Sequence, residues 1–143
     1  MKKYIRTAKS PRYNVDRAFS SDPSERAKYA RRIKDPTALE VYIYDDSGAV
    51  RAAAAANANL PIEYMEVLAH DPDGNVLFNL SHNKSTPAPI LAELAESRFY
   101  GVRMGVTLNP NTPEDVLREL ASDFDAIVCS YAKHALRKRG ISI

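Results

Sequence analysis

The sequence predicts an all-α protein, an α-solenoid built from short helix pairs. Apolar residues recur at positions i, i+3 and i+4, which is the spacing of one face of a helix. The same pattern returns every 26 residues through the middle of the chain. One pair of short helices cannot bury its own apolar face, but stacked pairs can, and a regular repeat therefore predicts a stack.

The repeat is defined by five kinds of residue that keep the same spacing in three consecutive units. The valine position extends one step further, to Val128. Three complete units of 26 residues follow, at 50–75, 76–101 and 102–127. The recurring residues are Val50, Val76 and Val102; Asn57, Asn83 and Asn109; Pro61, Pro87 and Pro113; Leu68, Leu94 and Leu120, each followed by an alanine.

The first half of each unit is expected to form a helix that ends at the asparagine. Its buried face is represented by Val102, Gly105 and Val106, and in the last copy by Val128, Tyr131 and Ala132. Asparagine tolerates the left-handed conformation, and its amide can satisfy the carbonyls that a helix end leaves free.

The second half of each unit is expected to form another helix, opened by Thr86-Pro87 or Thr112-Pro113. Threonine is a good N-cap and proline suits the first helical position. The residues expected to be buried in the three second helices are Tyr64, Met65, Leu68 and Ala69; Ile90, Leu91, Leu94 and Ala95; Val116, Leu117, Leu120 and Ala121.

The ends are expected to be degenerate capping units. In 22–49, Asp22-Pro23 opens a helix that reaches about Lys34, and Asp35-Pro36 opens a second one that buries Leu39 and Ile43. This unit is one residue out of register with the repeats. Residues 128–143 form a lone helix with Gly140 as its C-cap.

Residues 1–21 show no periodicity and are interpreted as a basic N-terminal arm. The domain organisation is therefore an arm at 1–21 followed by a single domain at 22–143. No apolar stretch approaches the roughly 20 residues of a membrane span, and no apolar segment follows the basic start. We expect a cytoplasmic protein that makes no membrane contact.

One stretch carries a resemblance to a known family. The residues Val102-Arg103, Asn109-Pro110-Asn111-Thr112-Pro113-Glu114 and Leu117-Arg118-Glu119-Leu120-Ala121-Ser122-Asp123 resemble the leucine-rich repeat variant family, which belongs to the wider HEAT-like α-solenoids. The resemblance covers residues 50–136 and implies a right-handed superhelix of short alternating helices.

The resemblance implies a fold and no cofactor. One member of that family carries an iron–sulfur cluster on a separate cysteine-rich segment, whereas Cys129 is the single cysteine here. The chain departs from the family pattern at Leu60, where threonine is expected, at Leu77 and Cys129, where arginine is expected, and at Ser97, where aspartate is expected.

Candidate catalytic and metal-binding residues are sparse. His70, His82 and His134 fall at different phases of the repeat, so nothing brings them together as ligands. Cys129 has no base or orienting group placed beside it, as a nucleophile would need. We therefore expect no metal, no cofactor and no enzymatic activity.

The acidic residues of the second helices form the main candidate binding site. They lie away from the apolar face and would line up across successive units as a docking surface for a basic protein partner. Ordinary solvation of helix surfaces, with acids favoured near helix starts, is the alternative interpretation. The candidate partner-binding residues are Glu63, Glu66, Glu93, Asp115 and Glu119.

A second candidate function is nucleic-acid binding through the basic ends. Residues 1–34 carry eleven Lys/Arg and three Asp/Glu, residues 35–125 carry five and fifteen, and residues 126–143 carry four and none. Basic clusters attract phosphate, although these ends could equally stay solvated or fold back on the acidic body. The candidate phosphate contacts are Lys2, Lys3, Arg6, Arg137, Lys138 and Arg139.

Arginines and aspartates also share phases in the repeat. Arg51 and Arg103 each follow a recurring valine, and Asp45, Asp71 and Asp123 precede the next unit. We expect contacts between these arginines and aspartates, with a row of phosphate-binding arginines as the alternative.

Overall fold

The computed structural model describes residues 18–143, and within that range the protein is all-helical, as predicted. This part of the chain forms nine α-helices and one 3₁₀ helix, without a strand. The elements are α3 (Pro23–Arg32), η1 (Pro36–Leu39), α4 (Glu40–Ile43), α5 (Gly48–Ala55), α6 (Ile62–Leu68), α7 (Gly74–His82), α8 (Ala88–Leu94), α9 (Tyr100–Leu108), α10 (Glu114–Leu120) and α11 (Ala126–Lys138).

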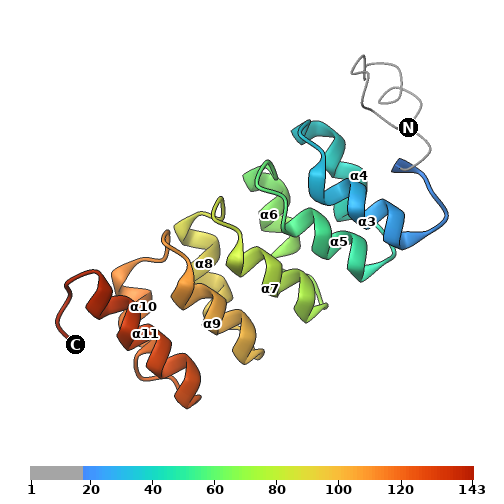
Figure 1. Ribbon diagram of the computed structural model, residues 1–143. Helices are drawn as coiled ribbons and strands as arrows, with labels where there is room; N and C mark the ends of the chain where they lie inside the picture. The colour runs from blue at the N-terminus through green and yellow to red at the C-terminus, as the bar shows by residue number, and fades with distance from the viewer. Residues whose placement is uncertain (1–17) are drawn as a thin grey trace.

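The helices lie in a row that ends at the C-terminal helix α11 (Figure 1). The helices α3, α5, α7, α9 and α11 pack side by side, each against the next. The helices α4, α6, α8 and α10 lie behind them. The helices α6, α8 and α10 each contact the front helices on either side, whereas α4 contacts α5, η1 and α6. The molecule is therefore two layers of short helices.

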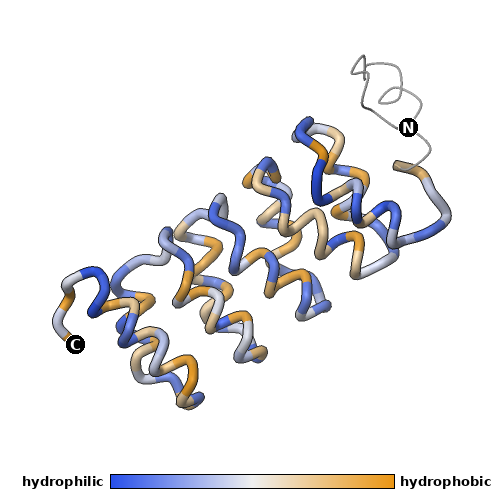
Figure 2. The backbone as a smooth tube through the Cα atoms, in the orientation of Figure 1, coloured by the Kyte–Doolittle hydropathy of each residue, from blue (hydrophilic) through white to orange (hydrophobic). Residues whose placement is uncertain are grey.

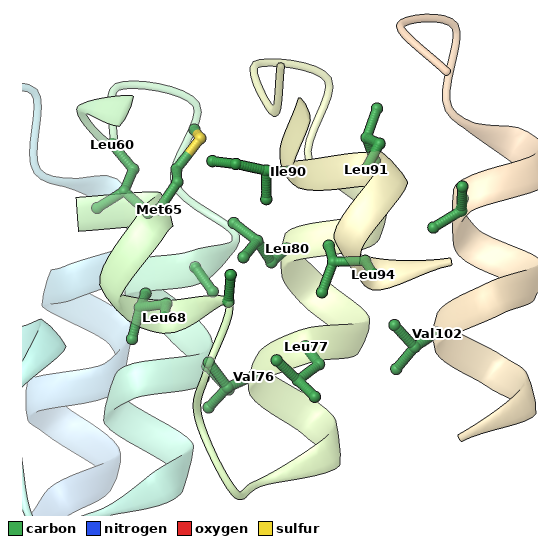
Figure 3. Packing of buried hydrophobic residues seen from close by; sticks show 14 of the residues in the cluster. Leu60, Met65, Leu68, Val76, Leu77, Leu80, Ile90, Leu91, Leu94 and Val102 are labelled. Atoms are coloured by element: carbon green, nitrogen blue, oxygen red, sulfur yellow. The ribbon is translucent and has the colours of Figure 1, made fainter. Parts of the chain in front are cut away.

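One continuous apolar core runs between the two layers. Val50, Val76, Val102 and Val128 are all at most 1% exposed, so each recurring valine faces the core as expected. Figure 3 shows Leu68 from α6, Leu80 from α7 and Leu94 from α8 pointing into the same layer. Figure 2 shows hydrophobic positions on every helix of the row, which is the pattern of amphipathic helices.

The residues expected to be buried in the second helices are buried, with one exception. Leu68, Leu94 and Leu120 are 1%, 2% and 4% exposed. Tyr64 is only half-buried. In α11, Tyr131 is also wrongly assigned to the buried face, because 41% of it is exposed.

The prediction that threonine caps the second helices is wrong. The hydroxyl of Thr86 donates 2.7 Å to the carbonyl of Leu80, and that of Thr112 donates 2.6 Å to the carbonyl of Val106. Both hydroxyls thus satisfy the end of the preceding helix, because both threonines are buried. The N-cap positions belong instead to Pro87 and Pro113, whose extended backbone precedes the helix by one residue.

The asparagines satisfy free carbonyls as expected, but without a left-handed backbone. Asn83 and Asn109 have extended dihedral angles, and each side-chain amide reaches the preceding helix pair. Asn83 donates to the carbonyls of Ala55 and Asn57 at 2.8 and 3.0 Å. Asn109 donates to the carbonyls of Ser81 and Asn83, both at 2.9 Å.

The N-terminal end of the row begins as predicted. Asp22 caps α3 by accepting the Ser24 N–H, and Asp35 caps η1 by accepting the Thr37 N–H. Leu39 and Ile43 are buried. Of the predicted arm, residues 1–17 lie outside the described residues. Ala18 is buried and its carbonyl accepts a 3.4 Å hydrogen bond from the Tyr42 hydroxyl.

The C-terminal end is closed by Gly140 and Arg139. Gly140 has φ +75°, and the N–H groups of Gly140 and Ile141 donate to the carbonyls of Arg137 and Leu136. This is the Schellman arrangement that ends many helices. The Arg139 guanidinium donates 2.6 Å to the carbonyl of Thr112 and 3.4 Å to that of Asn109. Arg139 therefore supplies the hydrogen-bond donors that an asparagine side chain supplies to the earlier helix pairs.

Candidate functional site

The rear helices present a row of solvent-exposed carboxylates, which we call the acidic row. Each rear helix turns its leucines toward the core, and this orientation leaves the remaining positions in water. The acidic row comprises Glu63 and Glu66 on α6, Glu93 on α8, and Asp115 and Glu119 on α10, all of them exposed.

Local helix electrostatics accounts for part of the acidic row. Glu63 and Asp115 lie in the first turns of α6 and α10, where the helix dipole favours a negative charge. Asp115 also accepts a 3.0 Å hydrogen bond from the Val116 N–H. Glu66 and Glu119 lie further along their helices, and the dipole does not explain their placement.

Most of the acidic row is free of ion pairs. Glu93 lies 3.1 Å from Nδ1 of His70, with both side chains about half exposed or more. Within residues 18–143, Glu63, Glu66 and Glu119 take part in no salt bridge. These carboxylates are available to an external cation.

The acidic residues outside the row behave differently, because four of them are paired with arginine. One pair, Glu114 with Arg118, lies within α10 and is exposed, whereas the other three join a helix to a turn. Arg51 donates to both oxygens of Asp71 at 2.7 and 3.2 Å, and Arg103 to both oxygens of Asp123 at 2.8 and 3.1 Å. The predicted contacts of Arg51 and Arg103 are thus confirmed. These guanidinium groups face carboxylates and not solvent phosphate.

A third pair joins Arg26 to Asp45, at 2.8 and 3.0 Å. Sequence reasoning missed this partner because the first unit is one residue out of register. All three arginines also donate to the carbonyl of the residue six positions earlier, which is Ser20, Asp45 or Ser97. The arginines therefore anchor the turn in front of each helix.

Two of the paired carboxyls have lowered pKa values. Burial acts to raise the pKa of Asp123, but the Arg103 guanidinium and the Asp125 N–H outweigh it, so the pKa lies below its usual value. The same balance holds for Asp45, where burial is outweighed by Arg26 and the Ser47 N–H. Both groups are therefore ionised in the folded protein at neutral pH.

The arginine–aspartate pair is replaced in the unit 76–101, where Leu77 and Ser97 stand at its two positions. A surface groove of about 360 Å³ lies there, with Leu77, Ser97 and Phe99 in its lining. A second groove, of about 310 Å³, lies one unit further, beside Phe124. The acidic row borders both grooves, because Glu93 lines the first and Glu119 the second.

Of the six candidate phosphate contacts, the structure describes three, Arg137, Lys138 and Arg139. Lys2, Lys3 and Arg6 lie outside the described residues. Arg137 and Lys138 are exposed in the last turn of α11. Arg139 is exposed as well, but its guanidinium already donates to backbone carbonyls.

The structure does not bring the histidines and the cysteine together either. Residues 18–143 contain no group of three or more His, Cys, Asp or Glu side chains placed to hold a metal ion. The Cys129 thiol donates 3.0 Å to the carbonyl of Ala121 and so joins α11 to the end of α10.

In the same described part of the chain, the longest apolar helix falls short of what a membrane span requires. In comparisons with known proteins, no family model, no curated protein and no solved structure matches this chain.

Proposed function

We propose that this chain is a cytoplasmic, non-enzymatic protein-interaction module that binds a basic partner through the acidic row. Its architecture would be a right-handed α-solenoid of 26-residue helix pairs, of the leucine-rich repeat variant type. Solenoids offer long, extended binding surfaces and usually act by contact.

The asparagine contacts support the repeat. Asn83 and Asn109 each donate to the backbone carbonyl of the asparagine that lies 26 residues earlier. The arginine–aspartate pairs support it as well, since Arg51 and Arg103 both bond the aspartate 20 residues later. Equivalent residues thus make equivalent contacts along the row.

One observation carries the proposed binding function, namely the contrast between two populations of carboxylates. Asp71 and Asp123 are held by arginine and are at most 7% exposed as side chains. Glu63, Glu66 and Glu119 are exposed without an ion pair, and the row they belong to borders two grooves. A partner that carries lysine or arginine would find unpaired charges with apolar recesses beside them.

Nucleic-acid binding through the basic ends is the second candidate. The observation in its favour is that α11 contains Lys133, Arg137 and Lys138 and no acidic residue. A salt titration of oligonucleotide binding tests this candidate, because phosphate contacts release counterions and affinity for nucleic acid falls steeply as salt rises. Binding to a duplex or single-stranded oligonucleotide that is lost on changing Arg137 and Lys138 to Gln would establish it.

The proposed function is tested by affinity capture with the full chain as bait, followed by mass spectrometry. A variant with Lys at Glu63, Glu66, Glu93, Asp115 and Glu119 should lose the captured protein. The control is Asp46→Lys, which reverses an exposed acidic charge outside the row. Capture that is unchanged by the five substitutions, or lost equally with Asp46→Lys, would refute the acidic row as the docking surface.

A further inference from the structure

The groove of about 360 Å³ at Leu77 and Ser97, which we call the open groove, lies where neighbouring units hold an arginine. Arg51 and Arg103 each place a guanidinium between the carboxylate of the aspartate 20 residues later and the carbonyl six residues earlier. Leu77 stands at this arginine position, and the carbonyl six residues before it is that of Asp71. A leucine side chain has no N–H group to donate. One place in a series of guanidinium sites therefore lacks its guanidinium.

The groove of about 310 Å³ beside Phe124, which we call the filled groove, shows the same place with its arginine present. Most of its lining residues lie 26 positions after those of the open groove. The side chains of Arg103 and Asp123 are 4% and 6% exposed there, and the Arg103 guanidinium lies 4.5 Å from the centroid of the Phe124 ring. In the open groove, Arg98 stands at the position of Phe124, and its guanidinium lies 4.7 Å from the centroid of the Phe99 ring. Arg98 therefore stacks on a ring of its own and does not form the recurring pair.

The open groove is lined by more carboxylates than cations. Glu93 and Glu96 line it, and both are exposed. Glu93 lies 3.1 Å from Nδ1 of His70, and Glu96 takes part in no salt bridge in the part of the chain that the structure describes. Among the described residues of the lining, Arg98 is the only cation. The charge around the groove is therefore negative.

We propose that the open groove receives an arginine side chain of the basic partner. This inference rests on the proposed function, because the acidic row brings the partner to the groove, and it adds the residue that the partner carries. A guanidinium is planar and weakly hydrated, so it can lie against an apolar side chain such as Leu77. Its several N–H groups can donate at the same time to the Glu96 carboxylate and the Ser97 hydroxyl, and the bond to the carboxylate is charge-assisted.

The open groove favours arginine over lysine. Within the chain, the Arg51 guanidinium bonds the Asp71 carboxylate and the carbonyl of Asp45 at the same time, which requires donors that point in different directions. A lysine ammonium is compact and strongly hydrated, and it lacks the flat faces that lie against apolar side chains. Selectivity for arginine therefore distinguishes this groove from the exposed carboxylates of the acidic row, which pair with either cation.

The test is a selection on the full chain with short displayed peptides whose positions vary among Arg, Lys, Leu, Gly and Ser. Enriched peptides should carry arginine at one position and either Arg or Lys at their other basic positions. An enriched peptide, made synthetically, should bind about tenfold more weakly when that one arginine is replaced by lysine. The same replacement elsewhere in the peptide should change affinity by no more than about twofold.

A variant that fills the groove with the chain's own arginine identifies the site. Leu77→Arg together with Ser97→Asp rebuilds the pair of the neighbouring units, leaves the net charge unchanged and leaves the acidic row in place. It should weaken the arginine peptide by about tenfold and make the arginine and lysine peptides bind equally. The control is Ala58→Arg with Asn59→Asp, which adds the same charges at exposed positions between α5 and α6 and should leave affinity unchanged.

A second variant tests the groove without altering its packing. Glu96→Gln removes an exposed carboxylate that lies outside the acidic row, and it should weaken the arginine peptide by about fivefold. Asp46→Asn removes an exposed carboxylate away from the groove and should have no effect. Circular dichroism establishes that each variant is folded.

Three results would overturn the inference, namely equal affinity for arginine and lysine at every position of the peptide, selectivity that persists when the groove is filled, and equal weakening by Ala58→Arg with Asn59→Asp. Peptides that bind without selectivity for arginine, yet are lost when the acidic row is changed to lysine, would leave the proposed function standing and refute the arginine site alone. Selectivity that depends on Leu77 and Ser97 but not on the acidic row would refute the row and keep the groove.

Discussion

The two edges of the row are held together by different chemistry. At the turns between the first and second helices, neutral side-chain amides of Asn57, Asn83 and Asn109 bind buried carbonyls of the preceding pair. We call this the amide edge. At the turns between successive helix pairs, arginine side chains bind aspartate side chains. We call this the charged edge.

The two edges also differ in how strictly they are kept. The amide edge has its asparagine in each of the three 26-residue units, and Arg139 supplies the donors after the last one. The charged edge lacks its pair at Leu77 and Ser97. The partners of an asparagine are backbone carbonyls, which no substitution removes, whereas arginine and aspartate can be replaced together. We therefore expect substitution to be tolerated better at the charged edge than at the amide edge.

Substitution in the core between the two edges should cause the largest loss of stability. Leu94 is 2% exposed, and Leu94→Ala should lower the free energy of unfolding by about 2–5 kcal/mol, because it leaves a cavity between the two layers. Urea denaturation measures this loss. A loss under about 1 kcal/mol would mean that the layers do not pack as described.

At the amide edge, Asn83→Ala should cost about 3 kcal/mol, because two buried carbonyls lose their donor. The matched control is Asn111→Ala. Asn111 also donates to two carbonyls, those of Lys84 and Thr86, but it is exposed, and its loss should cost under about 1 kcal/mol. Equal losses in urea denaturation would show that burial does not distinguish these amides.

At the charged edge, a double substitution should cost less than a single one. Arg103→Leu alone should cost about 2 kcal/mol, because it leaves the Asp123 carboxylate, which is 6% exposed, without its cation. Arg103→Leu together with Asp123→Ser reproduces the Leu77 and Ser97 arrangement and should lie within about 1 kcal/mol of the unchanged protein. A double variant less stable than Arg103→Leu would show that the pair is not replaceable.

The charged edge should also respond to acid, with a smaller effect. The folded pKa values of Asp45 and Asp123 are lowered, so their contribution to stability is complete above the unfolded pKa of about 3.8. It is lost as pH falls below that value through the folded pKa. Thermal denaturation between pH 2 and pH 6 should show a steeper loss for the unchanged protein than for Asp45→Asn. Parallel profiles would contradict the pairing of Asp45.

Helical periodicity allowed much of the fold to be predicted. Burial of the recurring valines and leucines follows from a spacing of three and four residues. The partners of Arg51 and Arg103 follow from their shared phase. Which helix the hydroxyls of Thr86 and Thr112 bond to could not be predicted, because capping rules consider one helix at a time. Both hydroxyls donate to carbonyls of the helix that precedes them in the chain.

The candidate site was predictable only in part. Exposure of the acidic row follows from the apolar face of each rear helix. The exposure of Tyr131 could not be predicted, since it has the spacing of a core residue but is 41% exposed.

The amide edge is tested most directly by hydrogen exchange of asparagine side chains, followed by nuclear magnetic resonance. Both side-chain protons of Asn57, Asn83 and Asn109 are donated to buried carbonyls, and these three amides should exchange with water far more slowly than that of the exposed Asn75. Exchange as fast as that of Asn75 would show that these amides are not held by buried carbonyls.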